Sequence, residues 1–220
     1  MKRSPLIPSG AFFLLVFGQL SAMAGFIIVE STFDADLDGW TKAPGSDSGS
    51  TLTWVGSGGN PGGYLRYNEA AQGSGDRVAA PAKFLGNMSA YVGGTFAMDR
   101  LTNILSNPVT ANDDIRLIGG GFTLRYDLPF PGLNEWITEE VDLRHDAGWV
   151  HVGSGIAPTA GEFASVMGNL TAIHLLADFR SGVETPSFDN IRMTGIPEPG
   201  TTALLLAGCA GLYFRRHRIG

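Results

Sequence analysis

The stretch Phe122-Thr123-Leu124-Arg125-Tyr126 decides the fold class, because apolar and polar side chains alternate along it without a break. Successive side chains of an extended chain point to opposite faces, so the alternation predicts a strand with one face in a core and the other toward solvent. The same alternation recurs in Trp136-Ile137-Thr138, and three glycines at 119–121 indicate a turn before the first strand. The chain is therefore expected to build its core from half-buried strands.

Short runs of β-type residues continue outward from this stretch in both directions, and clusters of turn residues separate them. The chain contains 31 glycines, many of them in these clusters. Many short strands at this spacing predict an all-β fold, an antiparallel sandwich. The predicted strands are Phe26–Thr32, Thr51–Val55, Tyr64–Tyr67, Gly94–Met98, Ile115–Ile118, Phe122–Tyr126, Glu135–Val141, Ala172–Phe179 and Ser187–Met193.

One short helix is expected among these strands, from Thr159 or Ala160 to about Leu170. Thr159 is a favourable N-cap, and Glu162 stands three residues later, where its carboxylate can bond back to the cap. The apolar residues that follow are spaced by three and four, which places them on one face of a helix: Phe163, Val166, Met167 and Leu170.

The charge of the body of the chain, Gly25 to Gly195, limits the partners that it can bind, and the cysteine content limits its cross-links. These residues include 20 Asp and Glu against 10 Lys and Arg, a net charge of −10, whereas the whole chain carries −6. An acidic body argues against nucleic acid or anionic lipid as a partner, and it is compatible with neutral sugars or divalent cations. The single cysteine, Cys209, lies in the carboxyl-terminal segment, so the body forms no internal disulfide.

The amino-terminal segment, residues 1–24, has the three-part layout of a secretory signal peptide. Lys2 and Arg3 supply the positive charge, an apolar core follows at 11–20, and Ala24 occupies the last small-residue position of a cleavage site. The core is too short to span a bilayer. A buried amphipathic helix of the fold is the alternative, but the layout favours removal by signal peptidase after Ala24.

The carboxyl-terminal segment, residues 196–220, begins with a proline motif and continues as a short apolar helix. Pro197, Glu198 and Pro199 end any preceding strand, because proline cannot donate a ladder hydrogen bond. The transmembrane-like apolar run that follows, counted from Thr201 to Phe214, would extend only about 21 Å as a helix, against ~30 Å of hydrocarbon. The segment therefore predicts a marginal, temporary membrane anchor.

A basic cluster ends the chain, at Arg215, Arg216 and Arg218. Its position predicts a cytoplasmic end, with the body of the protein on the outside of the membrane. An ordinary carboxyl-terminal anchor behind a proline-rich linker is the alternative.

The order of Pro197-Glu198-Pro199, apolar helix and arginine cluster resembles the PEP-CTERM sorting signal of Gram-negative bacteria. The resemblance implies recognition by an exosortase, an integral membrane transpeptidase that cuts near the motif. The body would then be released toward the cell surface or extracellular matrix, usually in organisms that make exopolysaccharide. The three motif residues would serve recognition and have no catalytic role.

Two blocks of the body resemble the laminin B (laminin type IV A) domain. The first block runs from Val78 to Asn87 and from Tyr91 to Asp99, and the second contains Trp149, the predicted helix and the closing run Phe188-Asp189-Asn190-Ile191-Arg192. The order agrees over Phe33 to Met193. The resemblance implies a jelly-roll sandwich of the galactose-binding-like kind, used as a non-catalytic extracellular module.

A structural calcium ion is the one cofactor that the sequence suggests. Residues 34–39 have the D-x-D-x-D-G opening of a calcium loop, but Gly45 stands where such a loop needs a bidentate glutamate, so a surface turn is preferred. The galactose-binding-like resemblance implies a different calcium site, where the first and last strands meet. That site would bring Glu30 or Asp36 near Asp189.

The functional prediction depends on aromatic side chains and on weak catalytic signals. Tyr64 and Tyr67 flank a glycine-rich loop and are predicted to stack on sugar rings, although most aromatic residues within strands belong to a core. His151 and His174 lack partners at ligand spacing, and no hydrolase motif occurs. The chain is therefore predicted to be a non-enzymatic surface or matrix protein that is associated with exopolysaccharide and binds carbohydrate. A secreted polysaccharide-active enzyme is the alternative, with two of the many carboxylates converging on a cleft.

Overall fold

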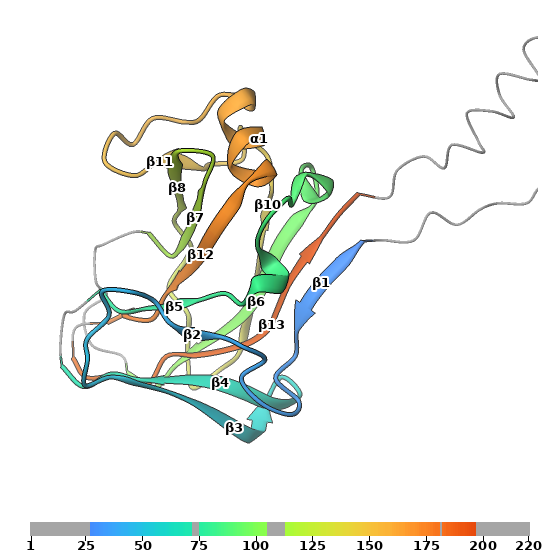
Figure 1. Ribbon diagram of the computed structural model, residues 1–220. Coiled ribbons are helices and arrows are strands. Elements are labelled where there is room, and N and C mark those ends of the chain that lie inside the picture. Colours follow the sequence, from blue (N-terminus) through green and yellow to red (C-terminus); the bar gives the residue numbers. More distant parts are fainter. Residues whose placement is uncertain (1–26, 72–74, 105–112, 181, 197–220) are drawn as a thin grey trace, which may run out of the picture. The chain divides into compact units, whose positions relative to one another are not determined.

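Two β-sheets face each other across one hydrophobic core in the computed structural model, which describes residues 27–71, 75–104, 113–180 and 182–196 (Figure 1). The sheets have seven and six strands, and all but one of the strand pairs are antiparallel. The predicted all-β jelly-roll sandwich with one short helix is confirmed. The predicted signal peptide and sorting signal lie outside the described residues.

The seven-stranded sheet has the order β10-β6-β13-β4-β3, with β1 beside β13 and β9 parallel to β6. The first and last strands of the body therefore pair, with Ile28 opposite Thr194 and Ser31 opposite Ile191 (Figure 1). The strands of this sheet are β1 (Ile28–Ser31), β3 (Thr51–Gly59), β4 (Gly62–Asn68), β6 (Thr95–Thr102), β9 (Gly132–Leu133), β10 (Ile137–Asp142) and β13 (Ser187–Thr194).

The six-stranded sheet has the order β11-β8-β7-β12-β5-β2. Its inner face is apolar because side chains alternate between the two faces along each strand. On β7, Ile115 and Leu117 point inward and are buried, whereas Arg116 and Ile118 point outward and are half-buried. The strands are β2 (Thr41–Lys42), β5 (Arg77–Ala79), β7 (Ile115–Gly119), β8 (Phe122–Tyr126), β11 (Val150–His151) and β12 (Leu170–Leu176).

Trp149 joins the helix to the core. Its side chain is fully buried, with its ring centroid 5.2 Å from that of Tyr126 and 6.1 Å from that of Phe163. Its indole N–H donates a 2.9 Å hydrogen bond to the carbonyl of Asp142. The polar end of the ring is therefore satisfied while its apolar surface is removed from water, which is the favourable way to bury a tryptophan.

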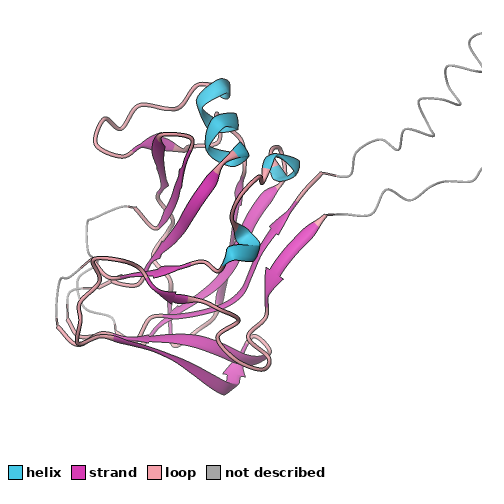
Figure 2. Cartoon of the chain, in the orientation of Figure 1, coloured by secondary structure: helices cyan, strands magenta, loops and turns pink. Residues whose placement is uncertain are grey.

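Helix α1 (Ala160–Gly168) is the longest helix of the described residues (Figure 2), and it begins at the predicted capping box. The Thr159 hydroxyl accepts a bond from the Glu162 N–H, and the Glu162 carboxylate accepts one from the Thr159 N–H at 2.8 Å. The helix packs against β7, β8 and the 3₁₀ segment η2 (Ser89–Tyr91), while a second such segment, η1 (Ala82–Phe84), follows β5. In the described part of the chain, no helix has both the length and the apolar character needed to cross a membrane.

Candidate binding cleft

An open cleft of about 650 Å³ lies on the outer face of the six-stranded sheet. The alternation that turns Leu117 and Ile173 into the core turns their neighbours on β7 and β12 outward into this cleft. Loop residues 44–46 and Gly121 also line it. The outward side chains that decide its chemistry are Arg77, Arg116, Ile118 and His174.

Three basic residues stand in a row across neighbouring strands of this face. Arg125 of β8 is directly opposite Arg116 of β7, and Arg116 is directly opposite His174 of β12. We call Arg125, Arg116 and His174 the basic row. Directly opposed side chains of like charge destabilise a sheet, so this arrangement needs compensating contacts.

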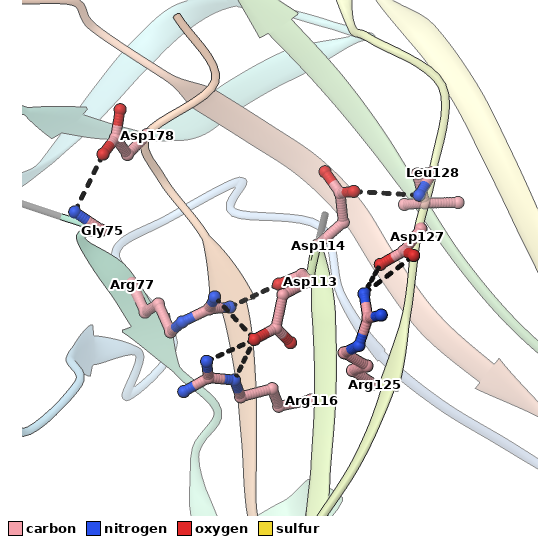
Figure 3. Close-up of polar contacts among 9 residues, drawn as sticks. All are labelled: Gly75, Arg77, Asp113, Asp114, Arg116, Arg125, Asp127, Leu128 and Asp178. Atoms are coloured by element: carbon pink, nitrogen blue, oxygen red, sulfur yellow. Dashed lines mark hydrogen bonds and ion pairs between the residues drawn. The ribbon is translucent and has the colours of Figure 1, made fainter. Parts of the chain in front are cut away.

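Two aspartates supply these contacts (Figure 3). Arg77 donates to the Asp113 carbonyl at 2.6 Å and lies 3.3 Å from the Asp113 carboxylate. Arg116 bonds the same carboxylate oxygen through Nε at 2.7 Å and also through Nη2. Arg125 holds both oxygens of Asp127, at 2.6 and 2.8 Å. The guanidinium groups are therefore fixed in place, and two of them share one carboxylate.

Burial and repulsion between like charges shift the pKa values of Arg77 and His174 on this face. Burial lowers the pKa of Arg77 to about 10, while the Asp113 charge opposes the shift, so Arg77 remains a cation at neutral pH. Burial also lowers the pKa of His174, and the positive charges of Arg77 and Arg116 lower it further. His174 is therefore neutral at pH 7, and the fixed charges in the cleft are those of the guanidinium groups.

Phe122 and His151 border the cleft from the core side of the sheet, because Phe122 packs against the core with Leu124, and His151 stands opposite Leu124 in the register. The rings of Phe122 and His151 lie 5.4 Å apart between centroids, with planes inclined by 58°. The His151 Nε2 atom lies 3.5 Å from the Glu162 carboxylate, so this ring pair lies beside the capping box of α1. The outer face itself supplies fixed hydrogen-bond donors from its arginines.

The predicted sugar-stacking pair, Tyr64 and Tyr67, is not part of this cleft, and that prediction is wrong. Tyr67 is completely buried, and Tyr64 is 7% exposed and packs edge-on against Trp136 at 5.3 Å. Both residues belong to β4, which lies between β3 and β13 in the other sheet. Because their ring faces are covered by protein, neither residue can stack on a sugar.

The predicted calcium ligands do not come together. Glu30 and Asp36 are exposed, and the Asp36 carboxylate accepts a 2.6 Å bond from the Asp38 N–H within its own turn. Asp189 is buried and accepts from the N–H groups of Asn60 and Asn190, at 2.6 and 2.8 Å. No three His, Cys, Asp or Glu side chains of the described residues are grouped to hold a metal ion.

Asp189 has other acidic neighbours instead. Burial raises the pKa of Asp189 to about 6, and the charges of Asp99 and Asp34 raise it as well. Asp99 stands directly opposite Asp189 on β6, and one of its carboxylate oxygens is buried without a hydrogen-bond partner among the described residues. The two carboxylates therefore form an acidic pair that differs from the predicted ligand set.

Sequence reasoning missed the cleft itself. His151 and His174 were noticed only as histidines without spaced partners, and Arg77 and Arg116 carried no motif. The signal that was available is the outward position of Arg125 in its alternating strand, but only the register of the sheet shows which basic residues lie beside it.

Solved proteins with similar structures include a laminin domain and carbohydrate-binding modules. One is the L4b domain of human laminin alpha-2, with a TM-score of 0.49, 14% identity, and coverage of 55% of this chain and 70% of that chain. Another is the family 11 carbohydrate-binding module from Clostridium thermocellum, in complex with a β-1,3-1,4-mixed-linked tetrasaccharide, with a TM-score of 0.49, 16% identity, and coverage of 79% and 98%. The solution structure of CtCBM11 has a TM-score of 0.50 at 18% identity and covers 81% and 100%, which shows a common fold.

Sequence comparison gives the family. No curated protein matches the chain. The family model of laminin B (domain IV) matches residues 78–203, which is more than half of the chain and includes both blocks that carried the resemblance. The chain belongs to the laminin B (domain IV) family.

Proposed function

We propose that this protein binds polysaccharide through the cleft on the outer face of the six-stranded sheet, as a non-catalytic module. The observation that supports this most directly is an open cleft of about 650 Å³ that presents immobilised guanidinium donors. Sugars present hydroxyl acceptors at their edges, so fixed N–H donors suit them. The fold shared with CtCBM11 is compatible with this role.

The lining of the cleft favours binding over hydrolysis. A glycosidase needs two carboxyl groups flanking the scissile bond. Among the described residues that line the cleft, none is Asp or Glu. A polysaccharide-active enzyme remains the alternative, and release of reducing sugar during incubation with bound polysaccharide would identify it.

Affinity gel electrophoresis tests the binding proposal. Purified protein should be retarded in gels that contain its polysaccharide, and Ile118→Trp should lose most of that retardation because the larger side chain fills the cleft. Arg144→Trp is the matched control, because Arg144 is exposed, pairs with Asp146 and does not line the cleft. Equal retardation of the wild type and Ile118→Trp would contradict binding in this cleft.

The terminal signals complete the proposal. They support a precursor that signal peptidase cleaves after Ala24, that is held briefly in the inner membrane of a Gram-negative bacterium, and that an exosortase cleaves near Pro197–Pro199. The product would serve the cell surface or the exopolysaccharide matrix. Intact-mass analysis of the native protein checks this, and a product that retains Arg215, Arg216 and Arg218 would contradict sorting.

A further inference from the structure

We infer that the cleft selects anionic glycans, those whose sugars carry a carboxylate or a sulfate ester, over neutral ones. This inference rests on the proposed polysaccharide binding and assigns the chemical class of its ligand. The acidic composition of the body favours neutral sugars or cations, so the inference depends on where the basic residues lie rather than on how many there are.

The side chains that line the cleft are basic, although the body as a whole is acidic. The body has a net charge of −10, yet the described residues lining the cleft include two arginines, two histidines and no acidic residue. Charge concentrated in a concave site acts on a ligand at short range, whereas the more distant surface charges are screened beyond about 8 Å at physiological salt. A ligand seated in the cleft therefore meets positive charge.

The arginines of the cleft share their nearest carboxylate. Arg77 and Arg116 both contact Asp113, and Arg77 also interacts electrostatically with Asp114 and Asp178. Among the described residues, the carboxylate that pairs with Arg116 is therefore one that a second guanidinium also uses. An anion placed against Arg116 would give this guanidinium a partner that it does not share.

The geometry of Arg116 leaves a donor edge for such an anion. Nε and Nη2 are engaged by Asp113, Nη1 has no hydrogen-bond partner among the described residues, and the side chain is 32% exposed. A guanidinium that is already held on one side loses little conformational freedom when it binds on the other. Planar N–H donors match carboxylate and sulfate oxygens in charge and direction.

The test compares ligands that differ only in charge. Retardation of the purified protein is measured in gels containing polygalacturonate or its methyl ester, and dextran sulfate or dextran. We expect at least tenfold tighter binding to a charged member than to its neutral counterpart, and the two pairs distinguish carboxylate from sulfate recognition. Arg116→Gln should remove at least tenfold of the affinity for the charged polymer, and Arg144→Gln should not change it.

A second variant guards against loss of folding. Thr123 is half-exposed on β8 beside this surface, so Thr123→Asp should fold normally, as judged by circular dichroism, and weaken binding to the charged polymer by repulsion. Equal binding to a charged polymer and its neutral counterpart would overturn the inference and leave polysaccharide binding standing. Absence of retardation by every polymer would overturn both.

Discussion

Arg100 is the buried cation whose removal we expect to lower the free energy of unfolding most. It lies on β6 with no exposed surface and bonds Glu139 through Nε and through Nη2 at 2.8 Å. It also donates to the Asp114 carboxylate and to the Pro129 carbonyl, both at 2.6 Å, and its guanidinium lies 5.1 Å from the ring centroid of Phe179. The sandwich therefore buries one cation together with two carboxylates.

Arg100→Met removes the cation and leaves both carboxylates buried. Breaking a buried ion pair from one side costs about 3–5 kcal/mol, because the remaining charge loses its compensation. For a domain of this size each kcal/mol lowers the melting temperature by ~2–4 °C, so a drop of about 10 °C is expected. Thermal unfolding at pH 7, followed by circular dichroism, measures it.

Two further variants make the Arg100 prediction specific. Arg192→Met is the matched control, because Arg192 also lies on a strand but is half-exposed and 3.9 Å from Glu140, and exposed pairs are worth about 1 kcal/mol or less. Adding Glu139→Leu to Arg100→Met should recover part of the loss, since it removes one orphaned charge. If Arg100→Met lowers the melting temperature no more than Arg192→Met does, this reasoning is refuted.

Three other outcomes follow from described contacts. Burial, with the nearby carboxylates adding to it, raises the pKa of Glu69 to about 7, so the folded state binds a proton that the unfolded state has lost and stability falls as pH rises from about 4.5 to 7. Glu69→Gln should therefore raise the melting temperature at pH 8 and have little effect at pH 5; an equal effect at both would contradict it. Thr159→Ala should cost about 1 kcal/mol by opening the capping box, whereas Thr159→Ser should not, and denaturant unfolding compares them. Because Glu30, Asp36 and Asp189 do not meet, millimolar calcium should leave the melting temperature unchanged, and a calcium-dependent rise that Asp189→Ala abolishes would restore the predicted site.

Local sequence signals predicted most of the secondary structure. The alternation in Phe122–Tyr126 and the capping box at Thr159 act within a few residues, so they are visible without knowledge of the fold. The strands that escaped prediction are β2, β5, β9 and β11, which are two or three residues long. Runs this short show no period, and they exist because a distant strand supplies their hydrogen bonds.

The candidate site was predicted poorly because exposure and adjacency are tertiary properties. Tyr64 and Tyr67 flank a glycine-rich loop in the sequence, which favours an exposed site, but the packing of β4 covers both side chains. Glu30 and Asp189 lie on the first and last strands, which do pair as predicted, yet the register places Arg192 opposite Glu30. The first and last strands therefore pair without bringing Glu30 next to Asp189.

Sequence signals alone are enough to establish the all-β class, the place of the one helix, the laminin B resemblance and the acidic charge of the body. Each of these depends on neighbouring residues, on the order of motifs or on composition. The folded sheet is needed to place Arg125, Arg116 and His174 side by side and to link Arg77 to them through Asp113. The register of β12 against β7 aligns residues that are far apart in the chain, and it is set by packing of the whole core.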